Sequence, residues 1–189
     1  YTSNDSLKIP TFIVVNSQET EVLERLKANQ ISYKTLEKDT LLQVMNERVH
    51  AFEAPKKPYE GHYFHSKMET TFEQNTILFK KGDILIDLRQ PNRQFILSTL
   101  ISKADDSYFR WNFFDSYLQQ KEYFSPYVFE DQAIELLKQN PSLKEALEQR
   151  KKESKEFRES SWDQLYFIYQ HSDLFEKSYH LLPVSFGWD

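Results

Sequence analysis

The sequence predicts an α+β protein, with a mixed, largely antiparallel sheet from the N-terminal half and a helical C-terminal half packed on it. Two observations lead to this fold class. β-rich runs separated by turn residues fill residues 9–88, and helical patterns of apolar residues follow over 91–180. We therefore expect one domain over residues 9–189, after a disordered or truncated end at 1–8.

The first elements predicted are a strand, a helix and a second strand. Residues 9–15 form an apolar β-rich run, residues 17–29 start with capping and acidic residues, and residues 31–36 alternate like a strand. Two parallel strands need such a crossover, so we expect these two strands to pair in parallel. The segment has no glycine-rich phosphate-binding motif, which argues against a dinucleotide-binding site.

Two consecutive antiparallel hairpins are predicted next. The expected strands cover residues 41–52, 61–72, 76–79 and 84–88. The loop before the second strand contains Pro55 and Pro58, and turns are expected at Gln74-Asn75 and at Lys81-Gly82-Asp83. This part of the chain supplies most of the predicted sheet.

From Pro91 onwards the pattern becomes helical, because proline suits the first turn of a helix. Residues 108–118 are so aromatic that a buried core cluster is favoured over a ligand-binding platform. Further helices are expected over 129–139, from Ser142 onwards, and over 161–169. Residues 181–186 contain Pro183 and are predicted as a terminal edge strand.

Composition excludes several classes of function. The formal net charge is -5, so nucleic acid is not an expected partner. There is no cysteine, which excludes disulfides, cysteine nucleophiles and thiolate metal sites. No apolar run reaches the length of a membrane-spanning helix, and the three glycines form no phosphate-binding loop.

The residues that carry chemistry do not form a recognisable catalytic motif. His50 and Glu53 match the loose H-x-x-E zinc pattern but stand against a proline loop, so we do not expect a metal there. Glu60 and Asp106 could perform acid–base chemistry if they met in a cleft, although surface charge is the simpler interpretation. No G-x-S-x-G or cofactor motif occurs, so this chain alone is not expected to be an enzyme.

A series of short motifs occurs in one order through the middle of the chain. These are Pro58-Tyr59-Glu60-Gly61-His62, Lys81-Gly82-Asp83, Gln90-Pro91, Arg93, Asp106-Ser107 and Trp111-Asn112-Phe113-Phe114-Asp115. In order and spacing, the series resembles the region after the catalytic domain in large bacterial secreted zinc carboxypeptidase-like proteins, the carboxypeptidase A clan. The resemblance covers residues 9–186. Relatives carry Leu-Glu-Pro where this chain has Leu100-Ile101-Ser102, so no carboxylate role is expected there.

The resemblance implies a non-catalytic accessory domain that packs against, or positions a peptide substrate for, an upstream peptidase domain of the same polypeptide. It implies zinc in that peptidase domain, no cofactor in this chain, and a secreted or periplasmic location. It marks eight structural or binding residues: Glu60, His62, Gln90, Arg93, Asp106, Ser107, Trp111 and Asn112. Hydrogen bonds from three of them, Gln90, Arg93 and Asp106, are expected to fix the loop between strand, helix and aromatic cluster.

Two alternatives remain open at this point. The chain could be a glycan- or peptide-binding module that uses surface aromatics near Tyr59, Tyr63 or Trp111. It could also be an independent carboxylate-based hydrolase, which needs Glu60 and Asp106 to face each other in a deep pocket. Exposed aromatic rings would favour the first alternative, and a deep pocket with two carboxylates would favour the second.

Overall fold

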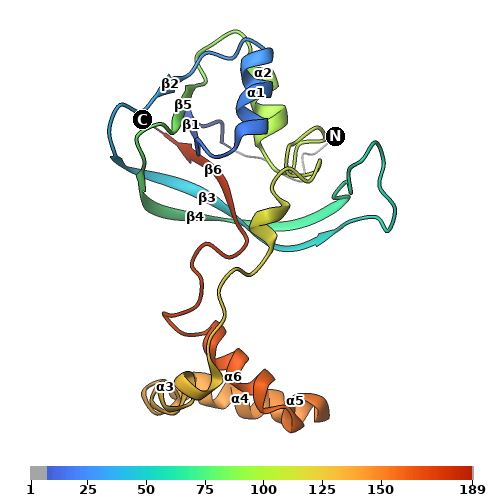
Figure 1. Cartoon of the computed structure of the whole chain (residues 1–189), viewed down its shortest axis with the longest axis vertical. Coiled ribbons are helices and arrows are strands. Elements are labelled where there is room, and N and C mark those ends of the chain that lie inside the picture. Colours follow the sequence, from blue (N-terminus) through green and yellow to red (C-terminus); the bar gives the residue numbers. More distant parts are fainter. Residues whose placement is uncertain (1–7, 189) are drawn as a thin grey trace. The chain divides into compact units, whose positions relative to one another are not determined.

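The computed structural model describes residues 8–188 and confirms the α+β fold class (Figure 1). It divides into two compact units. Unit 1 runs to Gln119 and resumes at His180, and unit 2 is the segment Gln120–Tyr179 between them. The sequence predicted one domain over residues 9–189. Residues 120–179 instead bury a hydrophobic core of their own, which explains why they form a separate unit.

Unit 1 is built on a six-stranded sheet with the strand order β2-β5-β1-β6-β3-β4. Its strands are β1 (Phe12–Val15), β2 (Lys34–Thr35), β3 (Thr40–Glu53), β4 (Lys67–Phe79), β5 (Ile84–Asp87) and β6 (Leu181–Gly187). Every neighbouring pair is antiparallel. The parallel component of the predicted mixed sheet is therefore not found among the described strands.

The expected parallel pairing of the first two strands is wrong, because β5 lies between them. β5 is antiparallel to both β1 and β2, so that Ile84 pairs with Val15 on one side and with Thr35 on the other. β1, the helix α1 (Thr20–Ala28) and β2 thus form a split β-α-β unit. The side chains of Ile84 and Ile86 are fully buried, which favours an interior position for β5.

Neither of the two hairpins predicted around the turns at Gln74-Asn75 and Lys81-Gly82-Asp83 forms, and a hairpin of β3 and β4 is found in their place. β3 and β4 pair along almost their whole length, and the connection between them is residues 54–66. The expected turn at Gln74-Asn75 is wrong, since both residues continue β4 and pair with Met45 and Val44. β4 does not pair with β5, and residues 61–66 lie outside β4 in the connection.

The prediction of a terminal edge strand is also wrong, because β6 lies in the middle of the sheet between β1 and β3. Pro183 is tolerated there for a local reason. The pairing of β6 with β1 ends at Val184, and its register with β3 shifts between Asn46 and Arg48. Pro183 falls in this irregular stretch, where its missing N–H removes no regular ladder hydrogen bond.

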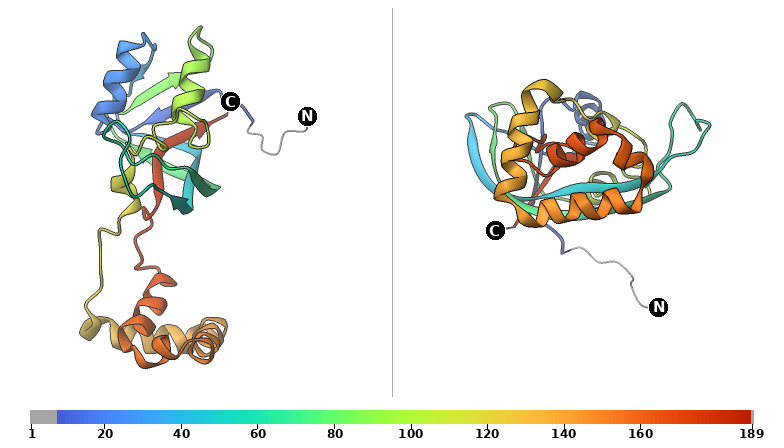
Figure 2. Two further views of the ribbon diagram at one scale, coloured as in Figure 1. Left: turned by 90° about the vertical axis from the view of Figure 1, so that its right-hand side faces the viewer. Right: turned by 90° about the horizontal axis from the view of Figure 1, so that it is seen from below.

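The main core of unit 1 lies on one face of the sheet, where α1 and α2 (Arg93–Leu100) pack (Figures 1 and 2). Leu26 of α1 and Ile96 of α2 are fully buried in this core. Phe186 of β6 is also fully buried and packs edge to face on Phe72, with ring centroids 5.7 Å apart. A smaller cluster around Val14 occupies the other face, as strand alternation requires.

Unit 2 contains four helices: α3 (Pro126–Gln139), α4 (Pro141–Glu153), α5 (Lys155–Glu159) and α6 (Ser161–Gln170). α6 contacts α3, α4 and α5, and the right-hand view of Figure 2 looks onto this arrangement. The N-caps Asn140 and Ser160 lie two residues and one residue before the predicted starts at Ser142 and Ser161, and Ser154 caps α5, for which no start was predicted. No helix within residues 8–188 has the length and apolar character needed to cross a membrane.

Unit 2 is an insertion in the chain of unit 1, and a hydrogen bond within unit 1 links the segments before and after it. The short 3-10 helix η1 (Asp115–Leu118) precedes the insertion, and the His180 N–H after it donates to the Tyr117 carbonyl at 3.1 Å. The His180 ring also bonds to the carbonyls of Val49 and Leu118, at 2.9 and 3.1 Å. The two chain ends left by removal of unit 2 would therefore already lie side by side.

We predict that replacing residues 120–179 by a short glycine–serine linker leaves unit 1 folded, because neither its sheet nor its core uses a residue of unit 2. The expected result is a dispersed amide NMR spectrum and a cooperative thermal transition. Residues 120–179 expressed alone should give a helical circular dichroism spectrum. A collapsed or aggregating shortened protein would contradict the independence of unit 1.

Candidate functional site

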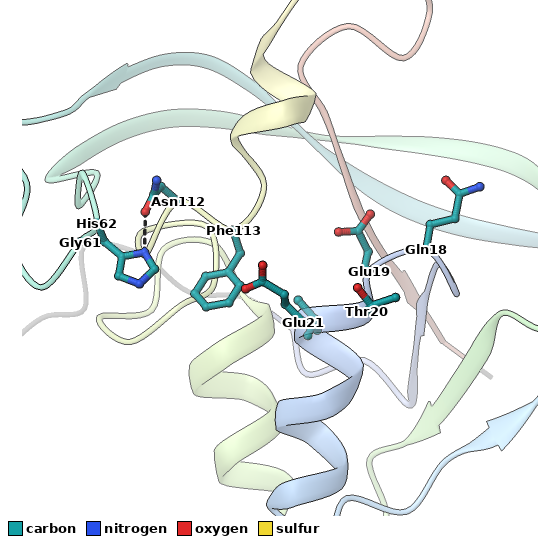
Figure 3. Close-up of a pocket in the computed structure, with 9 residues that line it drawn as sticks. Gln18, Glu19, Thr20, Glu21, Gly61, His62, Asn112 and Phe113 are labelled. Carbon is teal, nitrogen blue, oxygen red and sulfur yellow. Dashed lines mark hydrogen bonds between the residues drawn. The ribbon is translucent and has the colours of Figure 1, made fainter.

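Five of the eight residues marked by the sequence line two adjoining cavities in unit 1. The first cavity, of about 290 Å³, is lined by Arg25, Glu60, His62, Asp106, Tyr108, Trp111 and Phe113. The second, of about 360 Å³, is lined by Gln18, Glu19, Thr20, Glu21, Val22, Gly61, His62, Asn112 and Phe113. The two share His62 and Phe113, and we call them together the cleft. Its walls come from α1, the β3–β4 connection and the loop before η1 (Figure 3).

A tight turn presents Glu60 to the first cavity. Tyr59 and His62 exchange two backbone hydrogen bonds of 2.8 and 2.9 Å, with Glu60 and Gly61 between them. Both central residues have positive φ, 48° and 84°, as a type I′ turn requires. Glycine takes this conformation readily, but glutamate does so at some cost in strain. The Glu60 side chain is exposed and makes no hydrogen bond or ion pair within residues 8–188.

His62 is held in one orientation by the loop opposite. Asn112, whose φ is also positive at 55°, places its amide oxygen 2.8 Å from Nδ1 of His62 (Figure 3). An amide oxygen only accepts hydrogen bonds, so Nδ1 carries the proton and Nε2 of the neutral ring is left as an acceptor. The ring of His62 also stacks on Phe113, with centroids 5.6 Å apart. The cleft thus has a fixed imidazole at its centre.

Trp111 forms the aromatic side of the first cavity. Its ring lies 6.5 Å from that of Tyr59, 5.8 Å from that of His62 and 5.2 Å from that of Phe64. Tyr59 is 63% exposed, so this aromatic group opens to solvent, whereas Tyr63 is 43% exposed but lines neither cavity. The sequence favoured a core for residues 108–118, and Phe109 and Phe114 do lie in the core. Trp111, however, is only half-buried and faces the cleft.

The charged groups of the cleft differ in how they are paired. The guanidinium of Arg25 lies over Phe113, 4.4 Å from the ring centroid, and is 3.7 Å from the Glu21 carboxylate. Glu19 accepts a very short hydrogen bond from the Tyr117 hydroxyl. Burial and this bond raise the pKa of Tyr117, so it donates at all physiological pH values. Asp106 is exposed and unpaired within the described residues.

Tyr108 is the one deeply buried polar side chain among those lining the first cavity within the described chain. It is 5% exposed, and its ring packs on Phe113 with centroids 5.2 Å apart. Its hydroxyl has no hydrogen-bond partner of acceptable geometry in the described structure, although Thr99 and Arg25 lie near enough to act on it. Burial raises the pKa of this hydroxyl, so it stays protonated.

Three of the marked residues lie outside the cleft. Gln90 ties α2 to the chain after α1, with its side chain bonded at 3.0 Å to both the N–H and the carbonyl of Ser32. Ser107 is fully buried and donates to the Ser102 carbonyl at 2.6 Å. Arg93 is exposed and makes no side-chain bond within residues 8–188. Of the three residues expected to fix the loop by hydrogen bonds, Gln90 alone does so.

Arg25 and Tyr108 belong to the cleft but were not identified from the sequence. Arg25 sits in an ordinary amphipathic helix, and Tyr108 is one of many aromatics in its segment. A pair that was also missed is the buried His65 with the partly exposed Asp115, with Nε2 of His65 2.7 Å from the carboxylate. His65 is packed between Phe52 and Phe109 and lines neither cavity of the cleft, so it holds the loop in place.

The H-x-x-E pair is used for other contacts. His50 bonds to Thr71 at 2.7 Å, and Glu53 pairs with Lys67 at 3.1 Å. Among residues 8–188, no group of three or more His, Asp or Glu side chains is placed to hold a metal ion. A scan against protein-family models and searches of curated proteins and of solved structures find no match to this chain.

The cleft combines partly buried aromatic rings with two carboxylates that have no partner among the described residues. Glu60 and Asp106 do line one cavity, as the hydrolase alternative requires. Both side chains are exposed, however, and their cavity is open to solvent, whereas that alternative needs a deep pocket. The structure thus describes an α+β protein with an open cleft lined by aromatic and acidic side chains.

Proposed function

We propose that this chain is a non-catalytic binding domain that holds an extended peptide segment in the cleft. The observation that carries the proposal is the pair of Trp111 and Tyr59: Tyr59 is exposed, and the partly buried Trp111 lines a cavity together with the unpaired carboxylates of Glu60 and Asp106. Aromatic side chains of this kind supply most of the binding energy at peptide and protein interfaces. A peptide backbone would bond to polar groups such as Nε2 of His62.

Within a larger protein, this domain would position substrate for a zinc carboxypeptidase-like domain of the same polypeptide, which would be secreted or periplasmic. The resemblance in the sequence supports this context, because five of the eight residues that it marks line the cleft. Unit 2 exposes an apolar group that includes Tyr123, Val128 and Leu174, such as a neighbouring domain covers. Zinc would belong to the peptidase domain alone.

We expect Trp111→Ala to reduce peptide binding about tenfold or more, because buried tryptophan anchors typically contribute about 2 kcal/mol or more. The measurement is retention of a randomised pool of fluorescein-labelled twelve-residue peptides on the immobilised protein. Trp162→Ala is the matched control, since Trp162 lies in unit 2 and is 44% exposed. Trp111→Phe should recover part of the binding.

Two results would contradict the proposal. Equal retention by the wild-type protein, Trp111→Ala and Trp162→Ala would show that the cleft does not bind peptide. Release of C-terminal amino acids from peptides by this chain alone would show that it is catalytic. If this hydrolysis were lost in Glu60→Gln and in Asp106→Asn, the carboxylate-hydrolase alternative would replace the proposal. Retention of oligosaccharides in place of peptides would instead favour the glycan-binding alternative.

A further inference from the structure

A further cavity of unit 1 is larger than either cavity of the cleft and shares no lining residue with them. Its volume is about 500 Å³. Its walls come from the last residues of β3, the first residues of β4 and the loop between α2 and η1: Ala51, Phe52, Glu53, Lys67, Met68, Glu69, Lys103 and Arg110. Sites for small molecules occupy roughly 300–1,000 Å³, so this cavity is large enough for one.

The apolar wall of this cavity is formed by side chains on neighbouring strands. Phe52 and Met68 are opposite each other in the β3–β4 ladder, so their side chains lie on the same face of the sheet. Phe52 is 38% exposed, and its ring meets the ring of the buried His65 edge to face, with centroids 4.9 Å apart. This contact fixes the position of the Phe52 ring. The cavity therefore offers a preformed apolar surface to the body of a ligand.

Arg110 brings to the cavity a positive charge that pairs with no carboxylate among residues 8–188. The side chain is partly buried, and Nη1 and Nη2 donate to the carbonyls of Ser66 and Lys103 at 3.4 and 3.5 Å, which are long hydrogen bonds. Nε is buried and has no partner in the described structure. Each terminal nitrogen keeps a second N–H for another acceptor. A guanidinium in this state suits a carboxylate, which it can bind through two nitrogens at once.

The charges around the cavity favour a ligand with a single negative charge. Three cationic side chains line it, namely Lys67, Lys103 and Arg110. Two carboxylates, those of Glu53 and Glu69, line it as well. Lys67 and Glu53 pair at 3.1 Å and offset each other. The excess of one positive charge suits a carboxylate better than a phosphate group, whose charge approaches two at neutral pH.

We infer that this cavity binds a small monocarboxylate with an apolar body. The carboxylate accepts hydrogen bonds from Arg110, and the body lies along Phe52 and Met68. Two sources present these same groups: a free acid with an alkyl or aryl chain, and the C-terminal residue of a peptide with an apolar side chain. The inference does not depend on the proposed function, because this cavity and the cleft have no lining residue in common.

The test is an NMR titration of the isotope-labelled full chain with two acids, phenylbutyrate and acetyl-trialanyl-phenylalanine. Each acid is compared with its own carboxamide, which has the same body without the charge. Saturable shifts are expected at Phe52, Met68 and Arg110, with an affinity about tenfold higher for the acid, because the carboxamide loses the charge-assisted hydrogen bonds. Saturation by phenylbutyrate indicates a site for free acids, and saturation by the peptide alone indicates a site for C-terminal residues.

Arg110→Gln should reduce the affinity for the acid to that for its carboxamide, and Arg110→Lys should restore part of the difference. Arg93→Gln is the matched control, because Arg93 is exposed and makes no side-chain bond within the described residues. Phe52→Ala should weaken the binding of acid and carboxamide alike, since it removes apolar surface and no charge. Thermal unfolding checks that each variant is folded.

Equal affinity of the wild-type protein for each acid and its carboxamide would overturn the inference. An Arg110→Gln protein that is folded and keeps the preference for the acid would do the same. The absence of saturable shifts with every probe, or shifts confined to residues of the cleft, would also overturn it. All of these results would leave the Trp111→Ala prediction for the cleft unchanged, since that measurement concerns other residues.

Discussion

Phe186→Ala is expected to lower the free energy of unfolding of unit 1 by about 3–5 kcal/mol, the range found when a buried phenylalanine is truncated. Phe186 is 0% exposed, pairs with Ile13 on one side and Met45 on the other, and contacts the ring of Phe72. No neighbouring element can move inwards to fill the space, because β6 is held by strands on both sides. The cavity left behind therefore adds to the lost hydrophobic transfer energy.

Urea unfolding followed by tryptophan fluorescence measures this effect. The background protein carries Trp162→Phe, so that the signal comes from Trp111 and Trp188 of unit 1. Phe52→Ala on β3 is the matched control, since Phe52 is 38% exposed and should cost well under half as much. A loss of less than about 1 kcal/mol for Phe186→Ala would mean that the core does not depend on β6 in the way described.

Glu47→Ala should destabilise unit 1 by about 2–4 kcal/mol, because it leaves the buried Ser102 hydroxyl and the partly buried Thr70 hydroxyl without their acceptor. Glu47 is 1% exposed on β3, and its carboxyl accepts hydrogen bonds from Ser102 at 2.5 Å and Thr70 at 2.6 Å. Burial raises the pKa of this carboxyl above its usual value, against the opposing effects of the two hydroxyls and of Lys103. The folded state therefore favours the protonated acid.

This shift gives the stability of unit 1 a defined pH dependence. A raised folded-state pKa contributes stability that is fully present below the unfolded value and is lost as pH rises through the folded value. Glu47→Gln keeps an acceptor for Ser102 and Thr70 but cannot ionise. It should match the wild type at pH 4 and exceed its stability at pH 8, by urea unfolding at each pH. A constant difference between the two proteins from pH 4 to 8 would contradict the assignment.

Local patterns predicted the fold class and most element positions, but not the pairing of the strands. The apolar runs at residues 9–15, 41–52 and 84–88 are all strands close to the expected bounds. Their order in the sheet depends on contacts between residues far apart in sequence. The split arrangement around β5 and the central position of β6 both come from such contacts, which periodicity in a short window does not contain. The prediction of a turn at Asn75 was wrong because the pairing of β4 with β3 outweighs the preference of asparagine for turns.

For the candidate site, the sequence found residues with special backbone or aromatic roles and missed those that depend on packing. Glu60, His62 and Trp111 stood out because they belong to short motifs in loops. Arg25 did not, because the cleft recruits it from a helix whose sequence is unremarkable for a surface helix. Arg93 was chosen with the motifs but lies exposed outside the cleft, so membership of a motif does not place a side chain at the site.

The central position of β6 also governs when unit 1 can fold during synthesis. β1 pairs with β6 across more than 170 residues of sequence, and the whole of unit 2 is made in between. At roughly 5–20 residues per second, ribosomes need about 10–30 s to synthesise the residues between β1 and β6. Throughout this interval the edges of β1 and β3 that β6 will cover remain open to other chains. The synthesis of β6 is therefore the step that closes both strand edges of unit 1.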